Sequence, residues 1–333
     1  MKKFILNISF FILFIPLTGF SQQFPLTTQY VTYPYLINPA MAGYYGYSEF
    51  YLNYRREWAK IPQGPQTFRL SGYLPLHEDK MWLGTDIYKD HSGAIDRIKA
   101  SISYSYILKT GDAQNLFFGV WANFFQNTFS LLNLTGVDPS DPLFNNKSII
   151  NGTTYNAGFG IVYNLLNFNV GFAMPNAFND NAVYNYTGKL NFRMQREFLF
   201  HVSNIFSLNA YIDMKTMAVF RKTTNEPGNF DISITSIYLK RLWLGMLYRN
   251  TGSFAVNAGG YIGRGWSVAS SYELGVGGFN KYGGYTYEIT LSYRLGMAGN
   301  RFFQNKSGPV YYKKRVRRDW NRTSRPRVLD YRY

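Results

Sequence analysis

The sequence contains no cysteine and only three histidines, and charged residues make up 16% of its 333 positions. The absence of cysteine excludes disulfides, Cys-ligated zinc, iron–sulfur centres, cysteine nucleophiles and a lipidated N-terminal cysteine. An ordinary soluble domain carries about 25% charged residues. After its first turns the chain also lacks any apolar run of about 20 residues, which argues against a bundle of transmembrane helices.

Aromatic residues are abundant, with 29 Tyr, 28 Phe and 6 Trp, and hydrophobic residues reach 46%. The mean hydropathy is nevertheless −0.22. Apolar and polar residues must therefore be interleaved along the chain. The aromatic content and low charge also argue against disorder.

Residues 1–21 have the pattern of a secretory signal peptide. Two lysines precede an apolar stretch over 4–16, and the small residues Gly19 and Ser21 predict cleavage before Gln22. The alternative is an uncleaved membrane anchor. The stretch is short and interrupted, which favours cleavage and a mature protein outside the cytoplasm.

The rest of the chain alternates with a period of two, as β-strands do. Ile102, Tyr104 and Tyr106, for example, alternate with Ser103 and Ser105. Several such segments run about ten residues or more, the length that a tilted strand needs to cross a bilayer. We expect about fourteen strands, over 47–56, 66–74, 80–90, 96–109, 114–127, 152–164, 167–174, 196–203, 208–221, 230–239, 241–249, 253–262, 264–273 and 284–296.

The expected connections alternate between long and short. The odd-numbered ones include 57–65, 91–95, 128–151 and 175–195, whereas most of the even-numbered ones are turns of a few residues. Outer-membrane barrels have short periplasmic turns and long outer loops. We therefore expect the first strand to run outward and both barrel ends to lie in the periplasm.

These patterns predict an all-β fold, a transmembrane outer-membrane barrel of antiparallel strands over 47–296. Only a closed sheet satisfies every backbone polar group in lipid. Ile102 is expected to face lipid and Ser103 the lumen, so Ser103→Arg should be tolerated far better than Ile102→Arg. The serine-rich lumen face does not distinguish a water channel from a bore filled by protein.

A set of motifs follows the signal peptide. They are Gln29-Tyr30, Asn38-Pro39-Ala40 with Gly43, Tyr54-Arg55 with Trp58, and Pro65 with Thr67. Together they resemble the PorP/SprF family of type IX secretion membrane proteins, and the resemblance covers roughly residues 22–296. Where the family usually has Gly-Ala-Pro, this chain has Gly64 directly before Pro65, preceded by Gln63.

The resemblance implies an outer-membrane protein that supports the export or surface anchoring of a secreted protein, in some members the adhesins of gliding motility. The implied partners are the C-terminal domain of that secreted protein, periplasmic or outer-membrane secretion components, and outer-membrane lipid. A general diffusion porin or a ligand transporter with the same architecture is the alternative function.

Residues 22–46 cannot form one regular strand, because Tyr33-Pro34 and Asn38-Pro39 force extended or turn conformations before each proline. The segment is interpreted either as a folded periplasmic lead-in or partial plug, or as a cap that closes the barrel floor. Arg55 is a candidate for pairing with a carboxylate in the lumen, and Trp58 for an aromatic girdle. A purely structural role is the alternative for both.

The C-terminal residues 297–333 form a basic tail. From residue 301 onward it holds eleven Lys/Arg and two Asp, within a net charge of +16 for the whole chain. We expect it in the periplasm, bound to an acidic protein partner or an anionic lipid surface; a solvated tail without a partner is the alternative. Export argues against nucleic acid. The docking candidates are Lys313, Lys314, Arg315, Arg317 and Arg318.

No catalytic or cofactor site is expected. His77, His91 and His201 do not share metal-ligand spacing. Asp138 and Asp141 in one long connection could supply oxygen ligands to Ca²⁺, but Asp-Pro turns of this kind are common in loops. The sequence therefore predicts that the protein is not an enzyme.

Overall fold

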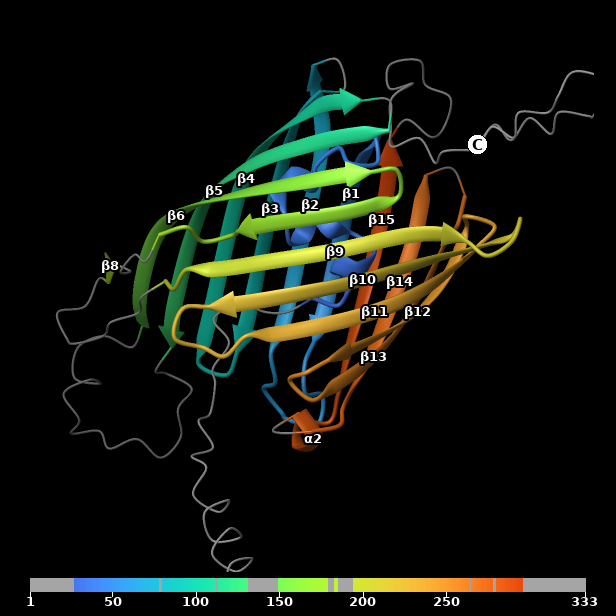
Figure 1. Cartoon of the computed structure of the whole chain (residues 1–333). Coiled ribbons are helices and arrows are strands. Elements are labelled where there is room, and N and C mark those ends of the chain that lie inside the picture. The colour runs from blue at the N-terminus through green and yellow to red at the C-terminus, as the bar shows by residue number, and fades with distance from the viewer. Residues whose placement is uncertain are drawn as a thin grey trace, which may run out of the picture.

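The computed structural model describes residues 27–77, 80–111, 113–130, 149–178, 183–184, 194–263, 265–277 and 280–295. Fourteen antiparallel strands in these ranges form one barrel (Figure 1). They are β1 Ser48–Arg56, β2 Gln66–His77, β3 Met81–Ser92, β4 Ile95–Gly111, β5 Gln114–Ser130, β6 Ile149–Leu165, β7 Phe168–Met174, β9 Glu197–Ser207, β10 Ile212–Thr223, β11 Asn229–Tyr238, β12 Leu242–Arg249, β13 Ser253–Tyr261, β14 Trp266–Gly275 and β15 Tyr285–Leu295.

The barrel closes because every one of these strands pairs on both sides. β1 pairs with β15, with Ser48 opposite Leu295, and β5 pairs with β6 along its whole length. A further two-residue strand, β8 (Val183–Tyr184), pairs with Gly152 and Thr153 of β6. The predicted fold, a closed antiparallel barrel of fourteen strands, is confirmed. No described helix is long and apolar enough to cross a bilayer.

The period-two pattern of each strand separates an apolar outer face from the lumen. In β12, Leu242, Leu244 and Met246 are exposed, whereas the intervening Trp243 and Leu247 are buried. Ile102 in β4 is 64% exposed. A belt of exposed apolar side chains repeats on strand after strand, which is the surface that a barrel presents to lipid.

The connections alternate less regularly than predicted. The expected connection over 91–95 is a two-residue turn at 93–94, where Gly93 has a φ of +60°. The long connections of the observed barrel are 57–65, 131–148, 175–196 and 276–284. Of these, 131–148 lies outside the described residues. The last contains the short helix α2, Asn280–Gly283, at the lower end of the barrel in Figure 1.

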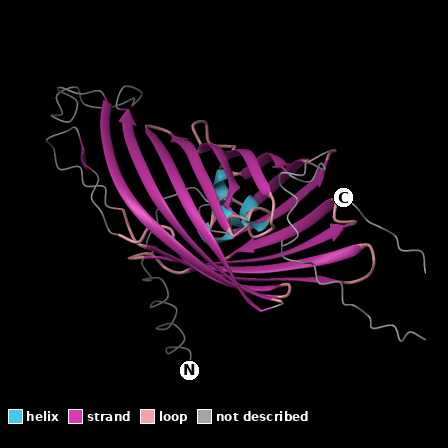
Figure 2. Cartoon of the chain, turned by 90° about the horizontal axis from the view of Figure 1, so that it is seen from above, coloured by secondary structure: helices cyan, strands magenta, loops and turns pink. Residues whose placement is uncertain are grey.

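The segment before β1 lies inside the barrel. Residues 27–46, hereafter the plug, form three short 3-10 helices, η1 Gln29–Val31, η2 Pro34–Leu36 and η3 Pro39–Met41. Nearly all of its side chains are buried. Figure 2, looking into the barrel, shows these helices within the ring of strands.

The plug runs lengthwise through the lumen. Thr27, the first described residue, hydrogen-bonds Glu288 in the half of β15 nearest the long connections. The plug ends next to Ser48, where β1 begins among the short turns. The sequence leaves open a periplasmic lead-in or partial plug and a cap at the barrel floor. The described residues 27–46 lie in the lumen and start in the half toward the long connections.

The filled lumen overturns one expectation. Ser103 does face inward, but it is 1% exposed and its hydroxyl lies 2.8 Å from the Tyr35 hydroxyl of the plug. Ser105 donates to the carbonyl of Ala42 at 2.9 Å. Small serines line β4 because the plug packs against them. An arginine at Ser103 would displace Tyr35, so the structure argues against the expectation that Ser103→Arg is tolerated far better than Ile102→Arg.

Candidate functional site

The family-like motif Asn38-Pro39-Ala40 docks the plug into a groove of glycines. The Asn38 Oδ1 accepts from the Ala40 amide at 3.0 Å and caps η3, while its Nδ2 donates to the Phe172 carbonyl at 3.2 Å. A Cβ at Gly160 of β6 would lie 2.0 Å from that Oδ1, and one at Gly119 of β5 would lie 2.3 Å from the Ala40 nitrogen. Only residues without side chains leave the space for this motif.

Gly43 is required for a different reason. Its φ is +76°, a conformation that L side chains rarely adopt, and a Cβ there would lie 2.2 Å from the Trp82 ring. Trp82 itself is fully buried. The backbone of the plug therefore turns against this indole and leads into β1.

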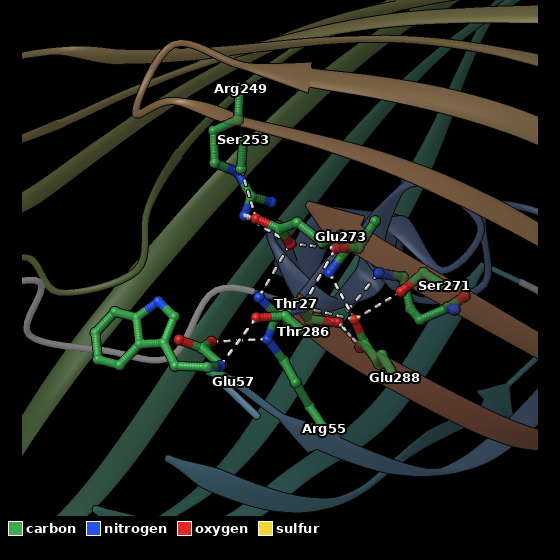
Figure 3. A network of polar contacts seen from close by, with 12 residues as sticks. Thr27, Arg55, Glu57, Arg249, Ser253, Ser271, Glu273, Thr286 and Glu288 are labelled. Carbon is green, nitrogen blue, oxygen red and sulfur yellow. Dashed lines mark hydrogen bonds and ion pairs between the residues drawn. The ribbon is translucent and has the colours of Figure 1, made fainter. Parts of the chain in front are cut away.

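Arg55 pairs with carboxylates in the lumen. Its guanidinium contacts Glu57 at 2.7 Å and both Glu273 and Glu288 at 3.2 Å (Figure 3). Arg249 contacts Glu273 at 3.1 Å and Asp231 at 3.2 Å, and so links these two carboxylates. We call these six residues, from β1, β11, β12, β14, β15 and the first connection, the carboxylate–arginine network.

The network holds four carboxylates and two guanidiniums, so its charges do not balance. The plug supplies neutral donors to the excess carboxylates. Glu288, which is 0% exposed, accepts from the Thr28 amide at 2.8 Å and from the Thr27 hydroxyl. The Tyr30 hydroxyl donates to Asp231 at 2.5 Å.

Ser105 holds the other end of the plug, because its hydroxyl donates to the Ala42 carbonyl at 2.9 Å. An ion pair lies where the plug leads into β1: Arg294 donates to Glu49 at 2.7 Å, and its guanidinium lies 4.3 Å from the ring centre of Tyr47. Tyr33 packs at a tilt against Tyr51, with the ring centres 4.7 Å apart. The plug is therefore fixed at both ends of the lumen.

The remaining motif residues shape the first long connection. The Trp58 amide donates to Thr286 at 3.3 Å, and a Cβ at Gly283 of α2 would meet the Trp58 ring at 2.4 Å. The Pro65 carbonyl accepts from the Glu57 amide at 2.8 Å. Thr67 is buried and donates to Asp90 at 2.8 Å. These residues fix the connection beside the network.

The other sequence candidates do not converge on one site. His91 lies 2.9 Å from Asp96, whereas the buried His201 lies 3.1 Å from the Asn38 amide nitrogen. No group of three or more potential metal ligands occurs in the described part of the chain. Asp138, Asp141 and the tail with Lys313, Lys314, Arg315, Arg317 and Arg318 lie outside the described residues.

Sequence reasoning missed most of the network. Asp231, Arg249, Glu273 and Glu288 each occupy a lumen-facing position in a strand whose alternate residues are apolar or aromatic. Charges at those positions of the period-two pattern are the signal that could have identified them. Asp231 and Arg249 are directly opposite on neighbouring strands, whereas the pairing of Glu273 and Glu288 with Arg55 could not be predicted, because it depends on the closure of β15 against β1.

A match to a known protein family shows to which family this chain belongs. The family described as "Type IX secretion system membrane protein PorP/SprF" matches residues 19–293. The chain belongs to the PorP/SprF family. The family and the barrel indicate the bacterial outer membrane. No curated protein matches the sequence.

Solved structures similar to this PorP/SprF-family chain are outer-membrane channels. A Pseudomonas aeruginosa FadL homologue is 13% identical, with a TM-score of 0.45, and the match covers 81% of this chain and 94% of that one. The CymD monoaromatic hydrocarbon channel is 12% identical, with a TM-score of 0.48 and coverage of 83% and 94%. The KdgM porin is 9% identical, with a TM-score of 0.38 and coverage of 74% and 98%. At these values the likeness carries no functional inference.

The network yields a prediction for stability. Arg55→Met leaves buried carboxylates without their cation and should lower the free energy of unfolding by about 3–5 kcal/mol. Urea titration of the barrel in detergent, followed by heat-modifiable migration on gels, measures the loss. The double variant Arg55→Met with Glu288→Gln should recover part of it.

His91→Ala is the matched control, because it breaks an exposed pair and should cost less than about 1 kcal/mol. Equal losses for Arg55→Met and His91→Ala would contradict the role assigned to the network.

Proposed function

We propose that this barrel anchors or helps to export a secreted surface protein, such as an adhesin, as part of the type IX secretion machinery. The observation that carries the proposal is the filled lumen. A diffusion porin needs a water-filled passage, whereas residues 27–46 occupy the bore and bond to the wall at both ends. This filling argues against the general diffusion porin that the sequence left open.

The family match supports the same function, because it associates the chain with type IX secretion. The proposed partners are the secreted protein and other periplasmic or outer-membrane secretion components. The basic tail remains a candidate docking segment for an acidic partner. Its attraction would be largely ionic and should weaken with salt.

We also propose an orientation, with the short turns and the C-terminal tail in the periplasm and the long connections outside. The lengths of the connections 57–65 and 175–196 support it. In this orientation the proposed partial plug over 22–46 extends, at Thr27, into the half of the lumen toward the long connections.

The function is tested by mild-detergent purification of the full chain from its native membrane, followed by mass spectrometry. A stoichiometric secreted protein should co-purify, and deletion of residues 301–333 should release it if the tail docks the complex. The matched control for the deletion keeps the whole tail and replaces its arginines by lysines, so that its charge is unchanged. Recovery of the full-length barrel without any secreted protein, together with normal surface display of the secreted protein in the strain whose barrel lacks residues 301–333, would contradict the anchor.

The orientation is tested by cysteine labelling, because the chain has no native cysteine. Gln63 in the first long connection and Ala210 in a short turn are both exposed. A membrane-impermeant maleimide added to intact cells should label Gln63→Cys and not Ala210→Cys, while both react after lysis. The reverse pattern would invert the barrel.

A further inference from the structure

A cavity of about 100 Å³ lies between the plug and the barrel wall, and we call it the vestibule. Thr27, Tyr30, Leu36 and Ile37 of the plug form one side of it. The opposite side includes Thr223 and Glu226, at the end of β10 and in the connection that follows. The vestibule therefore lies on the side of the plug toward the long connections.

One wall of the vestibule combines cations with aromatic rings. Lys99 Nζ lies 5.3 Å from the ring centre of Trp121 and 5.9 Å from those of Tyr88 and Phe125. Arg69 lies 5.1 Å from the Tyr88 ring centre. Both cations are more than nine-tenths buried.

The hydrogen bonds of Asp86 are largely satisfied without Lys99. Asp86 already receives two hydrogen bonds from Arg69, at 2.8 and 3.2 Å, and one from Ser71 at 2.8 Å. Among the described residues, the one hydrogen-bond acceptor of the Lys99 ammonium is Asp86, at 3.4 Å. An ammonium has three N–H donors, so two remain for a ligand.

The opposite wall adds a cation and two carboxylates. Arg221 lies 3.6 Å from Glu197, and Glu226 is farther along the same rim. Arg69, Lys99 and Arg221 thus line the vestibule with Glu197 and Glu226, while Asp86 pairs with Arg69 and Lys99. The two remaining N–H donors of Lys99 lie beside aromatic rings, which favours a ligand that carries a carboxylate next to a flat apolar group.

We propose that the vestibule binds a carboxylate-bearing, aromatic peptide segment of the protein that the barrel anchors. The assignment rests on the proposed function. The plug closes the inner side, so a ligand that enters from the long connections cannot pass through. A blind site suits a segment that inserts and stays, whereas a transported solute would need an exit.

The chemistry is tested with N-acetylphenylalanine as the probe and its C-terminal amide as the uncharged control. Binding to the full chain in detergent is followed by tryptophan fluorescence, with Trp121→Phe to assign the signal. The wild-type barrel should bind the acid more tightly than the amide, and Lys99→Gln should weaken binding of the acid by about 10–100-fold. Lys99→Arg should retain the preference.

Lys109→Gln is the matched control, because Lys109 lies at the exposed far end of the same strand, β4. It should bind both probes as the wild type does. Equal binding of acid and amide by the wild-type barrel, or an unchanged preference in Lys99→Gln, would overturn the proposal.

The purification described above separates this inference from the function on which it rests. Loss of the secreted protein from Lys99→Gln but not from Lys109→Gln supports the inference. Co-purification of the same protein with both variants would overturn it and keep the anchor. A barrel that binds the acid more tightly than the amide but co-purifies with no secreted protein would overturn both the peptide assignment and the proposed anchoring function. The vestibule would then be a site for a free organic acid.

Discussion

The structure depends on the hydrogen bonds that the plug donates to buried carboxylates of the barrel wall. Four carboxylates share two arginines in the network, and burying the surplus charge is costly unless neutral donors compensate. Thr27, Thr28 and Tyr30 provide these donors to Glu288 and Asp231. Wall and plug therefore satisfy one another, and neither surface is complete alone.

Shape complements this electrostatic fit. Gly119 and Gly160 clear space on the wall for the Asn38-Pro39-Ala40 motif, and Gly43 turns the backbone against Trp82. The motif residues thus dock the plug onto the barrel wall, and the glycines opposite them provide the space that this docking requires. A barrel built this way keeps its bore filled, and the vestibule lies on the side of the plug toward the long connections.

The barrel was predictable from the sequence because its signals are local. An alternation of apolar and polar residues with a period of two, sustained over ten or more residues, indicates a membrane strand whatever the neighbouring strands are. Most of the observed strands accordingly begin and end within a few residues of the expected bounds. The turn at 93–94 was missed because Gly93 permits a tighter reversal than the sequence pattern showed. The seating of the plug was not predictable, since it depends on pairs such as Thr28 with Glu288, 260 residues apart. Arg55 was assigned to the lumen, but its partners Glu273 and Glu288 lie in strands that reach it only when the barrel closes.

The most direct test of the central claim is the single-channel conductance of the full chain in a planar bilayer. Because the plug fills the bore, the wild-type barrel should be nearly silent, and a variant that lacks residues 27–44 but still inserts should conduct steadily. The variant Gly111→Ala, where a new Cβ would have only ordinary contacts at 3.7 Å, should stay silent like the wild type. A large, steady conductance from the wild-type barrel would contradict the account.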